Sequence, residues 1–270
     1  MLAYDHASRA TKGARDYQED SSAFWPPRDR ASGNAEVPPT AANSTRLVAV
    51  LADGMGGHTA GALASRMVCD SFISAYSGMN GARSDRLLKS LSAANDSIAA
   101  QVEANPMLSG MGTTLVAAVF TNEGVEWVSV GDSPLLLFRR GEIALLNEDH
   151  SLAPELDHLA AIGKITPEQA KNDPRRHMLR SAVTGDELDL VDISRKPLVL
   201  EEGDYIILAS DGLHTLETSE VERIISAYAA DGAEAVSNAL IRAVENMRDP
   251  HQDNTTVLAV RPLVGAGGST

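Results

Sequence analysis

Short runs of aliphatic and β-branched residues recur along the chain, and each is of strand length. Such runs, bounded by turn-forming residues, are typical of β-strands buried in a core. The sequence predicts six strands of this kind, over residues 47–52, 114–120, 125–130, 135–138, 205–209 and 255–260.

Between these runs, apolar residues recur at spacings of three and four, which places them on one face of a helix. Series of this kind predict three helices, over residues 64–76, 87–102 and 236–247. Asp249 and Pro250 are expected to stop the third helix. Thr166 and Gln169 have the pattern of a capping box, which predicts a short further helix that starts there.

The order of these elements favours a layered α+β fold. Strands gather in the middle and near both ends, without the strict alternation of a doubly wound parallel sheet. A chain of 270 residues that is 43% apolar can bury a full core. We expect one domain over residues 1–264. The segment 26–44 and the Gly-rich tail 265–270 are predicted to be irregular and mobile.

Charge and cysteine content narrow the function classes. A net charge of −14 argues against nucleic acid or an anionic membrane as the main partner, because both require a basic surface. Cys69 is the only cysteine, so an internal disulfide and a cysteine-rich zinc site are excluded. Ala75 stands where a cysteine-nucleophile phosphatase would place an arginine. With no secretion signal or long apolar run, we expect a cytoplasmic protein.

Four aspartates stand at the edges of predicted strands. Asp53 directly follows the run 47–52, Asp211 follows the run 205–209 after one residue, and each precedes a glycine. Asp132 follows the run 125–130, and Asp253 precedes the run 255–260. A single Asp-Gly pair is usually only a turn. Clustered carboxylates repel one another unless cations neutralise them, and oxygen ligands suit Mg²⁺ or Mn²⁺ rather than zinc. The pattern indicates a hard-metal site.

Near the N-terminus, Arg15 is followed closely by acidic residues. Its planar guanidinium suits the binding of phosphate. The alternative is a surface ion pair with Asp16, Glu19 or Asp20. Other chemistries lack their motifs, since the chain has no P-loop, no zinc-binding His-Glu-x-x-His, no Gly-x-Ser-x-Gly and no Gly-x-Gly-x-x-Gly.

Seven ordered motifs resemble those of the PPM or PP2C family of metal-dependent serine/threonine protein phosphatases, in its compact bacterial form. They are GARDYQED, ADGMGGH, MGTT, VGDS, EDHS, ASDGL and QDNTT, and the resemblance runs over residues 7–261 or so. It implies a four-layer α+β sandwich, with two antiparallel sheets flanked by pairs of helices. It also implies a binuclear Mn²⁺ or Mg²⁺ centre at one end of the sandwich.

The resemblance implies a role for each strand-edge aspartate. Asp53 would bridge both metal ions and the carbonyl group of Gly54 would bind one of them. Asp211 and Asp253 would bind the other ion, and Asp132 would help to hold a third, weaker one.

Further roles follow from the same resemblance. Arg15 would bind the substrate phosphate, and Glu19 and Asp20 would contact the metal ions through water or bind them weakly. Residues from about 154 to 186, which include the basic run 175–177, would form a flap beside the site. Flap sequence would influence the choice of substrate.

The chain departs from the family pattern in places that remove no proposed ligand. Gln18, Pro134 and His214 stand where Asn, Arg and an aromatic residue are usual. Met55 occupies the position of the histidine that eukaryotic relatives offer as proton donor. His58 is open to two interpretations, as a hydrogen bond at a helix start or as the general acid.

The function implied is one-step hydrolysis of phosphoserine and phosphothreonine in proteins by a metal-activated water, which would reverse Ser/Thr kinase signalling. Its partners would be phosphoproteins, including a Ser/Thr kinase or its substrates. Two alternatives stay open. One is a phosphoprotein-binding pseudoenzyme, against which the retention of Asp53, Asp211 and Asp253 argues. The other is a metal-dependent hydrolase of nucleotides, phosphotyrosine or other phosphoesters.

Overall fold

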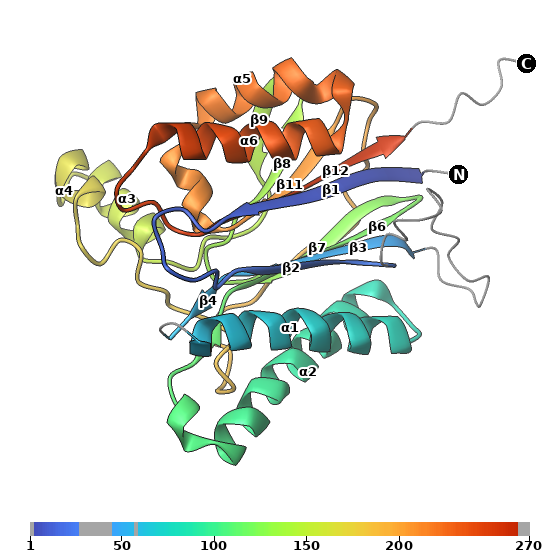
Figure 1. Ribbon diagram of the computed structural model, residues 1–270, viewed down its shortest axis with the longest axis vertical. Helices are drawn as coiled ribbons and strands as arrows, with labels where there is room; N and C mark the ends of the chain where they lie inside the picture. Colours follow the sequence, from blue (N-terminus) through green and yellow to red (C-terminus); the bar gives the residue numbers. More distant parts are fainter. Residues whose placement is uncertain (1–2, 27–44, 57–58, 264–270) are drawn as a thin grey trace, which may run out of the picture.

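The computed structural model describes residues 3–26, 45–56 and 59–263, and within them the fold has four layers. Two antiparallel five-stranded sheets lie face to face, and a pair of helices covers the outer face of each (Figure 1). This arrangement confirms the α+β sandwich that the motifs implied.

Each sheet combines strands from distant parts of the chain. The first sheet has the order β1 (Ala3–Thr11), β12 (Thr255–Leu263), β11 (Tyr205–Ala209), β8 (Leu135–Arg139) and β9 (Glu142–Leu145). The second has the order β10 (Asp192–Ile193), β7 (Gly124–Val130), β6 (Leu115–Thr121), β3 (Thr45–Ala52) and β2 (Ser21–Trp25). A small ribbon joins β4 (Gly54–Met55) to β5 (Gly112–Thr113).

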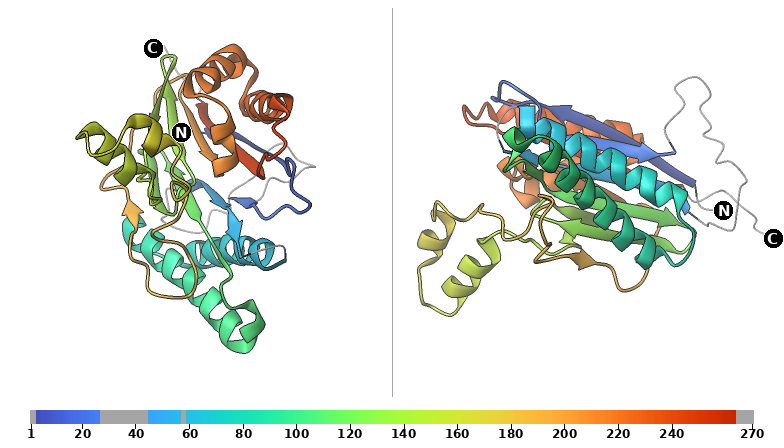
Figure 2. Two further views of the ribbon diagram at one scale, coloured as in Figure 1. Left: turned by 90° about the vertical axis from the view of Figure 1, so that its left-hand side faces the viewer. Right: turned by 90° about the horizontal axis from the view of Figure 1, so that it is seen from below.

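The helices occupy three places. The pair α1 (Thr59–Gly78) and α2 (Arg83–Ala104) packs on the second sheet, and the pair α5 (Thr218–Tyr228) and α6 (Ala233–Met247) packs on the first. The short helices α3 (Ala153–Ala161) and α4 (Pro167–Lys171) project from one end of the sandwich, as Figure 2 shows from two sides. Short 3₁₀ turns complete the fold at η1 (Pro106–Leu108), η2 (Asp211–Thr215) and η3 (Ala229–Asp231).

Three apolar clusters form the core, one between the sheets and one under each helix pair. Strand β3 serves two of them. Leu47 and Leu51 face the other sheet, whereas Val48 and Val50 face α1 and α2. Because both faces of the strand are buried, its sequence is a continuous apolar run rather than an alternating one. This burial explains why such runs were clear in the sequence.

All six predicted strands are confirmed, with small extensions at their ends. The predicted helices are confirmed as α1, α2, α4 and α6, and α6 ends at Met247, two residues before Asp249. The capping box forms, because Thr166 Oγ1 accepts from Gln169 N–H and Gln169 Oε1 accepts from Thr166 N–H. Cys69 is buried in α1, within the core cluster under α1 and α2.

Several elements were missed by the sequence analysis, among them β1, β2, α3 and α5. Strand β1 is half-buried and rich in polar residues, so it shows no apolar run. The segment and tail predicted to be irregular lie outside the described residues, apart from Pro26. In the part of the chain that is described, no helix is long and apolar enough to cross a membrane.

Candidate metal centre

A pocket of about 510 Å³ lies at the strand ends next to the segment that carries α3 and α4. The acidic side chains that the sequence analysis singled out come to it from several strand ends, although these strands belong to different sheets. Seven of the eight predicted site residues line it: Arg15, Glu19, Asp53, Gly54, Asp132, Asp211 and Asp253. The eighth, Asp20, is buried and interacts electrostatically with Asp53 and Asp211.

Asp53 is held by its main chain at the end of β3. Its N–H donates to Oγ1 of Thr114 over 3.0 Å, and its carbonyl oxygen accepts from Thr114 N–H at 2.9 Å and from Thr113 Oγ1 at 2.7 Å. Ser133 is in turn 2.7 Å from Thr114, hydroxyl to hydroxyl. The MGTT and VGDS motifs therefore fasten the turn that carries Asp53.

Gly54 permits a close approach of three segments. A Cβ atom at this position would lie 2.2 Å from the carbonyl oxygen of Gly61 in α1 and 2.6 Å from that of Glu19. No side chain fits in that space, so only glycine allows β4, α1 and the Glu19 loop to meet. The proposed role of the Gly54 carbonyl as a metal ligand stays a prediction.

Asp20 lies almost fully buried beneath the pocket, with only 8% of its surface exposed. Its Oδ2 accepts a hydrogen bond of 2.8 Å from Ser210, but its Oδ1 has no hydrogen-bond partner among the described residues. Burial raises the pKa of Asp20 to about 6, although hydrogen bonds from Thr256 and Ser210 oppose the shift. A buried carboxylate oxygen without a partner is a suitable acceptor for a cation or a water.

The carboxylates raise one another's pKa. Burial places the pKa of Asp53 well above its usual range, and it is raised further by the charges of four neighbours, Asp20, Asp211, Asp132 and Asp253. Burial and the charge of Asp253 also raise the pKa of Asp211. Holding these groups together as anions therefore costs free energy that bound cations would offset.

Asp132, which also lines the pocket, has a raised pKa as well. Burial, followed by the charges of Asp211 and Asp149, raises its pKa to about 7. The donor set is made of oxygen atoms alone, which fits Mg²⁺ or Mn²⁺. Within the described residues, however, no three His, Cys, Asp or Glu side chains already form a closed ligand group. The ligand assignments therefore stay predictions.

Asn254 joins the N-terminal motif to the C-terminal one. Its Oδ1 accepts from the N–H of Glu19 at 2.7 Å, and its Nδ2 donates to the carbonyl oxygens of Lys12 and Tyr17, each at 2.9 Å. The loop that carries Arg15 and Glu19 is thereby fixed to the start of β12. The sequence analysis missed this role, for which the only signal was the place of Asn254 in the QDNTT motif.

Arg15 reaches the pocket from this loop. Its Nη2 donates to Oδ2 of Asp253 over 2.6 Å, and both side chains are about half exposed. Among the described residues, the ion pair that Arg15 forms is thus with a pocket carboxylate. It is not the pair with Asp16, Glu19 or Asp20 that the sequence left open.

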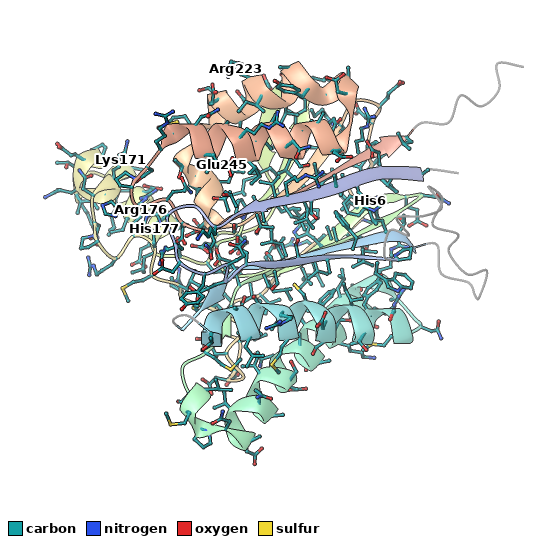
Figure 3. All side chains as sticks on the ribbon, viewed as in Figure 1. His6, Lys171, Arg176, His177, Arg223 and Glu245 are labelled. Carbon is teal, nitrogen blue, oxygen red and sulfur yellow. The ribbon has the colours of Figure 1, made fainter. Side chains whose placement is uncertain are left out.

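The segment around α3 and α4 supplies one wall of the pocket through His177, Met178 and Leu179. Figure 3 shows His177 and Arg176 between these helices and the ends of the sheets. Arg176 makes a two-pronged ion pair with Asp157 in α3, at 2.7 and 2.8 Å. Its charge therefore holds the segment together rather than facing solvent freely.

The pocket lining includes one histidine, His177, for which the sequence analysis proposed no role at the site. His177 lines the pocket and had been noted only as part of the basic run in the flap. Met55, at the position of the eukaryotic histidine, also lines it. His58 lies outside the described residues, so neither interpretation of it is tested.

Comparison with known proteins gives one consistent result. A family model described as Protein phosphatase 2C matches residues 40–252. The serine/threonine protein phosphatase PstP of Mycobacterium tuberculosis is 36% identical over 216 residues, which cover 79% of this chain and 40% of PstP. The serine/threonine phosphatase stp of Listeria monocytogenes is 34% identical over 184 residues, which cover 66% of this chain and 71% of that protein.

Solved structures agree with these sequence matches. The catalytic domain of PstP in complex with two manganese ions superposes with a TM-score of 0.74 at 29% identity. The match covers 98% of this chain and 100% of that one. The chain therefore resembles a catalytic domain along its whole length, while it spans about 40% of the length of the full PstP protein.

Proposed function

Because this chain belongs to the protein phosphatase 2C family, we propose that it is a metal-dependent protein phosphatase acting on phosphoserine and phosphothreonine. The observation that carries the proposal is the pocket whose lining combines Arg15 with the acids Asp53, Asp211 and Asp253. A guanidinium next to clustered carboxylates offers a phosphate group and divalent cations adjacent places to bind.

Five groups would hold the metal ions. Asp53, the Gly54 carbonyl group, Asp211 and Asp253 would hold two ions, and Asp132 would help to hold a third. The two manganese ions in the related PstP structure support this assignment, as do the raised pKa values of Asp53 and Asp211. When bound, Mn²⁺ or Mg²⁺ supplies Lewis acidity that activates water and offsets the charge of the phosphate.

The chain's own residues would bind and orient the substrate. Arg15 would hold the phosphate oxygens through its paired N–H groups, after exchanging its contact with Asp253 for the substrate. Asp20 is fixed through its bond to Ser210, so its free oxygen Oδ1 would accept a hydrogen bond from a water at the floor of the pocket. Glu19, which lines the pocket, would contact a metal ion through water or bind it weakly.

The proposed substrates are phosphoproteins, including a Ser/Thr kinase or its targets. Since the chain carries a net charge of −14, basic residues around the phosphosite would assist association.

The proposal treats residues 1–264 as one phosphatase domain, because the cluster between the sheets joins strands from both ends of the chain. A cytoplasmic location is part of it, since the only cysteine is a buried thiol.

The decisive experiment measures phosphate release from phosphothreonine peptides in Mn²⁺, in Mg²⁺ and in EDTA. We expect release that depends on the metal, and its loss in Asp253→Asn. Asp96→Asn on α2, which does not line the pocket, is the matched control and should behave as wild type. Peptide binding without release would indicate a pseudoenzyme. Release from nucleotides alone would indicate a different phosphoesterase.

A further inference from the structure

His150, in the EDHS motif, holds both peptide groups that flank Gly131, the residue before Asp132. Its main-chain N–H donates to the carbonyl oxygen of Gly131 at 3.1 Å, and its ring Nδ1 accepts from the N–H of Gly131 at 3.2 Å. His150 is buried, with 2% of its surface exposed. One residue, through its main chain and its ring, thus holds the turn that delivers Asp132 to the pocket.

Gly131 can take its place in this turn only as glycine. Its φ is +103°, and a Cβ atom would lie 2.7 Å from the side chain of Thr114. Thr114 on one side and His150 on the other therefore confine the peptide that precedes Asp132. Thr114 also holds the main chain of Asp53, so the position of the confined turn is fixed relative to Asp53.

The ring of His150 must be neutral to act in this way, because Nδ1 accepts a hydrogen and the remaining proton then sits on Nε2. Burial lowers the pKa of His150 and outweighs the nearby acids Glu148 and Asp192. Nε2 is itself buried and has no hydrogen-bond partner among the described residues. A buried donor left in this state destabilises the folded protein, so stability alone does not favour histidine here.

The same residue is joined to the wall of the pocket. The carbonyl oxygen of His150 accepts from Arg180 N–H at 2.8 Å, and Leu152 N–H donates to the carbonyl oxygen of Met178 at 3.0 Å. Met178 lines the pocket. His150 is therefore bonded to the Asp132 turn on one side and, through Arg180, to the segment that lines the pocket on the other.

Asp132 requires such a restraint. It is buried close to another acid, Asp211, and both burial and repulsion favour its turning toward solvent. We propose that His150 is a positioning residue, whose ring acts through Gly131 to fix the direction in which the Asp132 carboxylate enters the pocket. The inference rests on the proposed function as far as the role of Asp132 is concerned. The hydrogen bonds between His150 and Gly131 are independent of that function.

The test compares two substitutions of His150. His150→Leu removes the acceptor, whereas His150→Asn keeps an oxygen near the position of Nδ1 and should rescue part of the effect. The first measurement is amide hydrogen exchange at Gly131 by NMR in EDTA. We expect Gly131 to lose protection in the Leu variant and to keep much of it in the Asn variant.

Metal binding and kinetics give the second measurement. In calorimetric Mn²⁺ titrations we expect His150→Leu to keep two tight ions and to weaken the third by about tenfold, as substitutions behind a ligand commonly do. On phosphothreonine peptides, kcat should fall by a similar factor while KM stays near its wild-type value, because Arg15 is untouched.

Ser181→Ala is the matched control for a purely structural role. Ser181 is buried too, and its hydroxyl makes two hydrogen bonds to the main chain of Leu190, at 2.9 and 3.1 Å, without touching Gly131. It should lower the melting temperature without changing the weak Mn²⁺ affinity. If His150→Leu behaves like Ser181→Ala, or if Gly131 exchange is unchanged, the proposal is wrong. A wild-type protein without phosphatase activity would defeat the proposed function, and the exchange measurement would still decide the role of His150.

Discussion

Arg15 and Asp253 form an ion pair at the pocket, with 2.6 Å between Nη2 of the arginine and Oδ2 of the aspartate. The proposed phosphate-binding group and a proposed metal ligand thus satisfy each other. Exposed pairs of this kind contribute only about 0–1 kcal/mol, so the pair can open at little cost when phosphate and metal bind. The guanidinium is therefore held close to its site of action without being committed to Asp253.

Arg15→Ala is expected to raise KM for phosphopeptides about tenfold or more, because a charge-assisted contact to the phosphate is lost, with a smaller effect on kcat. Steady-state kinetics at saturating Mn²⁺ measures both constants. Arg223→Ala is the control, since Arg223 pairs only with Glu220 among the described residues and lies on α5, away from the pocket. An unchanged KM in Arg15→Ala would remove Arg15 from the phosphate site.

Asp211→Asn is expected to keep the fold and to lower turnover by orders of magnitude, because it weakens a proposed direct metal ligand. Its melting temperature in EDTA should not fall, since burial and Asp253 raise the pKa of Asp211 and a neutral amide avoids that cost. Thermal melts and phosphate-release assays test both parts. Turnover like that of wild type would contradict the metal assignment.

Asp132→Ala is expected to bind two metal ions tightly and to lose most phosphopeptide turnover, because the third, weakly held ion that we propose at Asp132 would help to position a water. If Asp132 serves only the turn after β7, the substitution should cost about 1 kcal/mol of stability and little activity. Calorimetric metal titration together with kinetics on the folded variant separates the two. Near-normal turnover at saturating Mn²⁺ would show that the turn is its only role.

The basic run 175–177, in the segment that we propose as a flap, should divide into a structural and a recognition part. Arg176→Ala is expected to loosen α3, and Asp157→Ala should do the same, because both break one ion pair. Arg175 pairs with Asp173 at the surface and is largely exposed. Arg175→Ala should therefore change the ranking of phosphopeptides more than activity on a small aryl phosphate. Equal losses on both substrates would argue against a substrate-selecting flap.

The metal-free protein is expected to become less stable as the pH rises from about 4 to above 7. The pKa of Asp20 is raised to about 6 and that of Asp132 to about 7, so the folded state binds more protons than the unfolded state in this window. Each pKa unit corresponds to about 1.4 kcal/mol. The lowered pKa of His150 opposes this trend below about 6.5, but the carboxylates are more numerous.

Urea unfolding in EDTA at a series of pH values measures this dependence. Asp20→Asn should flatten it, and Mn²⁺ should restore stability most at high pH, where the carboxylates are ionised. Stability that rises with pH in EDTA would mean that the acids are not held against one another as described.

Much of the fold could be predicted from the sequence because its strands are buried on both faces. The run Leu47–Leu51 was readable since side chains on each side of β3 enter a core. Strand β1 could not be predicted in the same way. It is stabilised by pairing with β12, from Ala3 opposite Leu263 to Thr11 opposite Thr255, and this pairing leaves no local apolar signature. Asp53 and Asp211 were visible because each stands in an Asp-Gly step after an apolar run.

The partners of the site residues were decided by the tertiary structure alone. Arg15 and Asp253 are 238 positions apart, and nothing near either of them in the sequence indicates their contact. The hydrogen bond between the His150 ring and Gly131 depends on a neutral ring and on the positive φ of Gly131. These two features meet only in the folded chain. Local sequence patterns indicate which residues are buried and which residues form turns. Electrostatic neighbours and hydrogen-bond partners depend on which distant segments pack together, because these forces act between atoms a few ångströms apart in space.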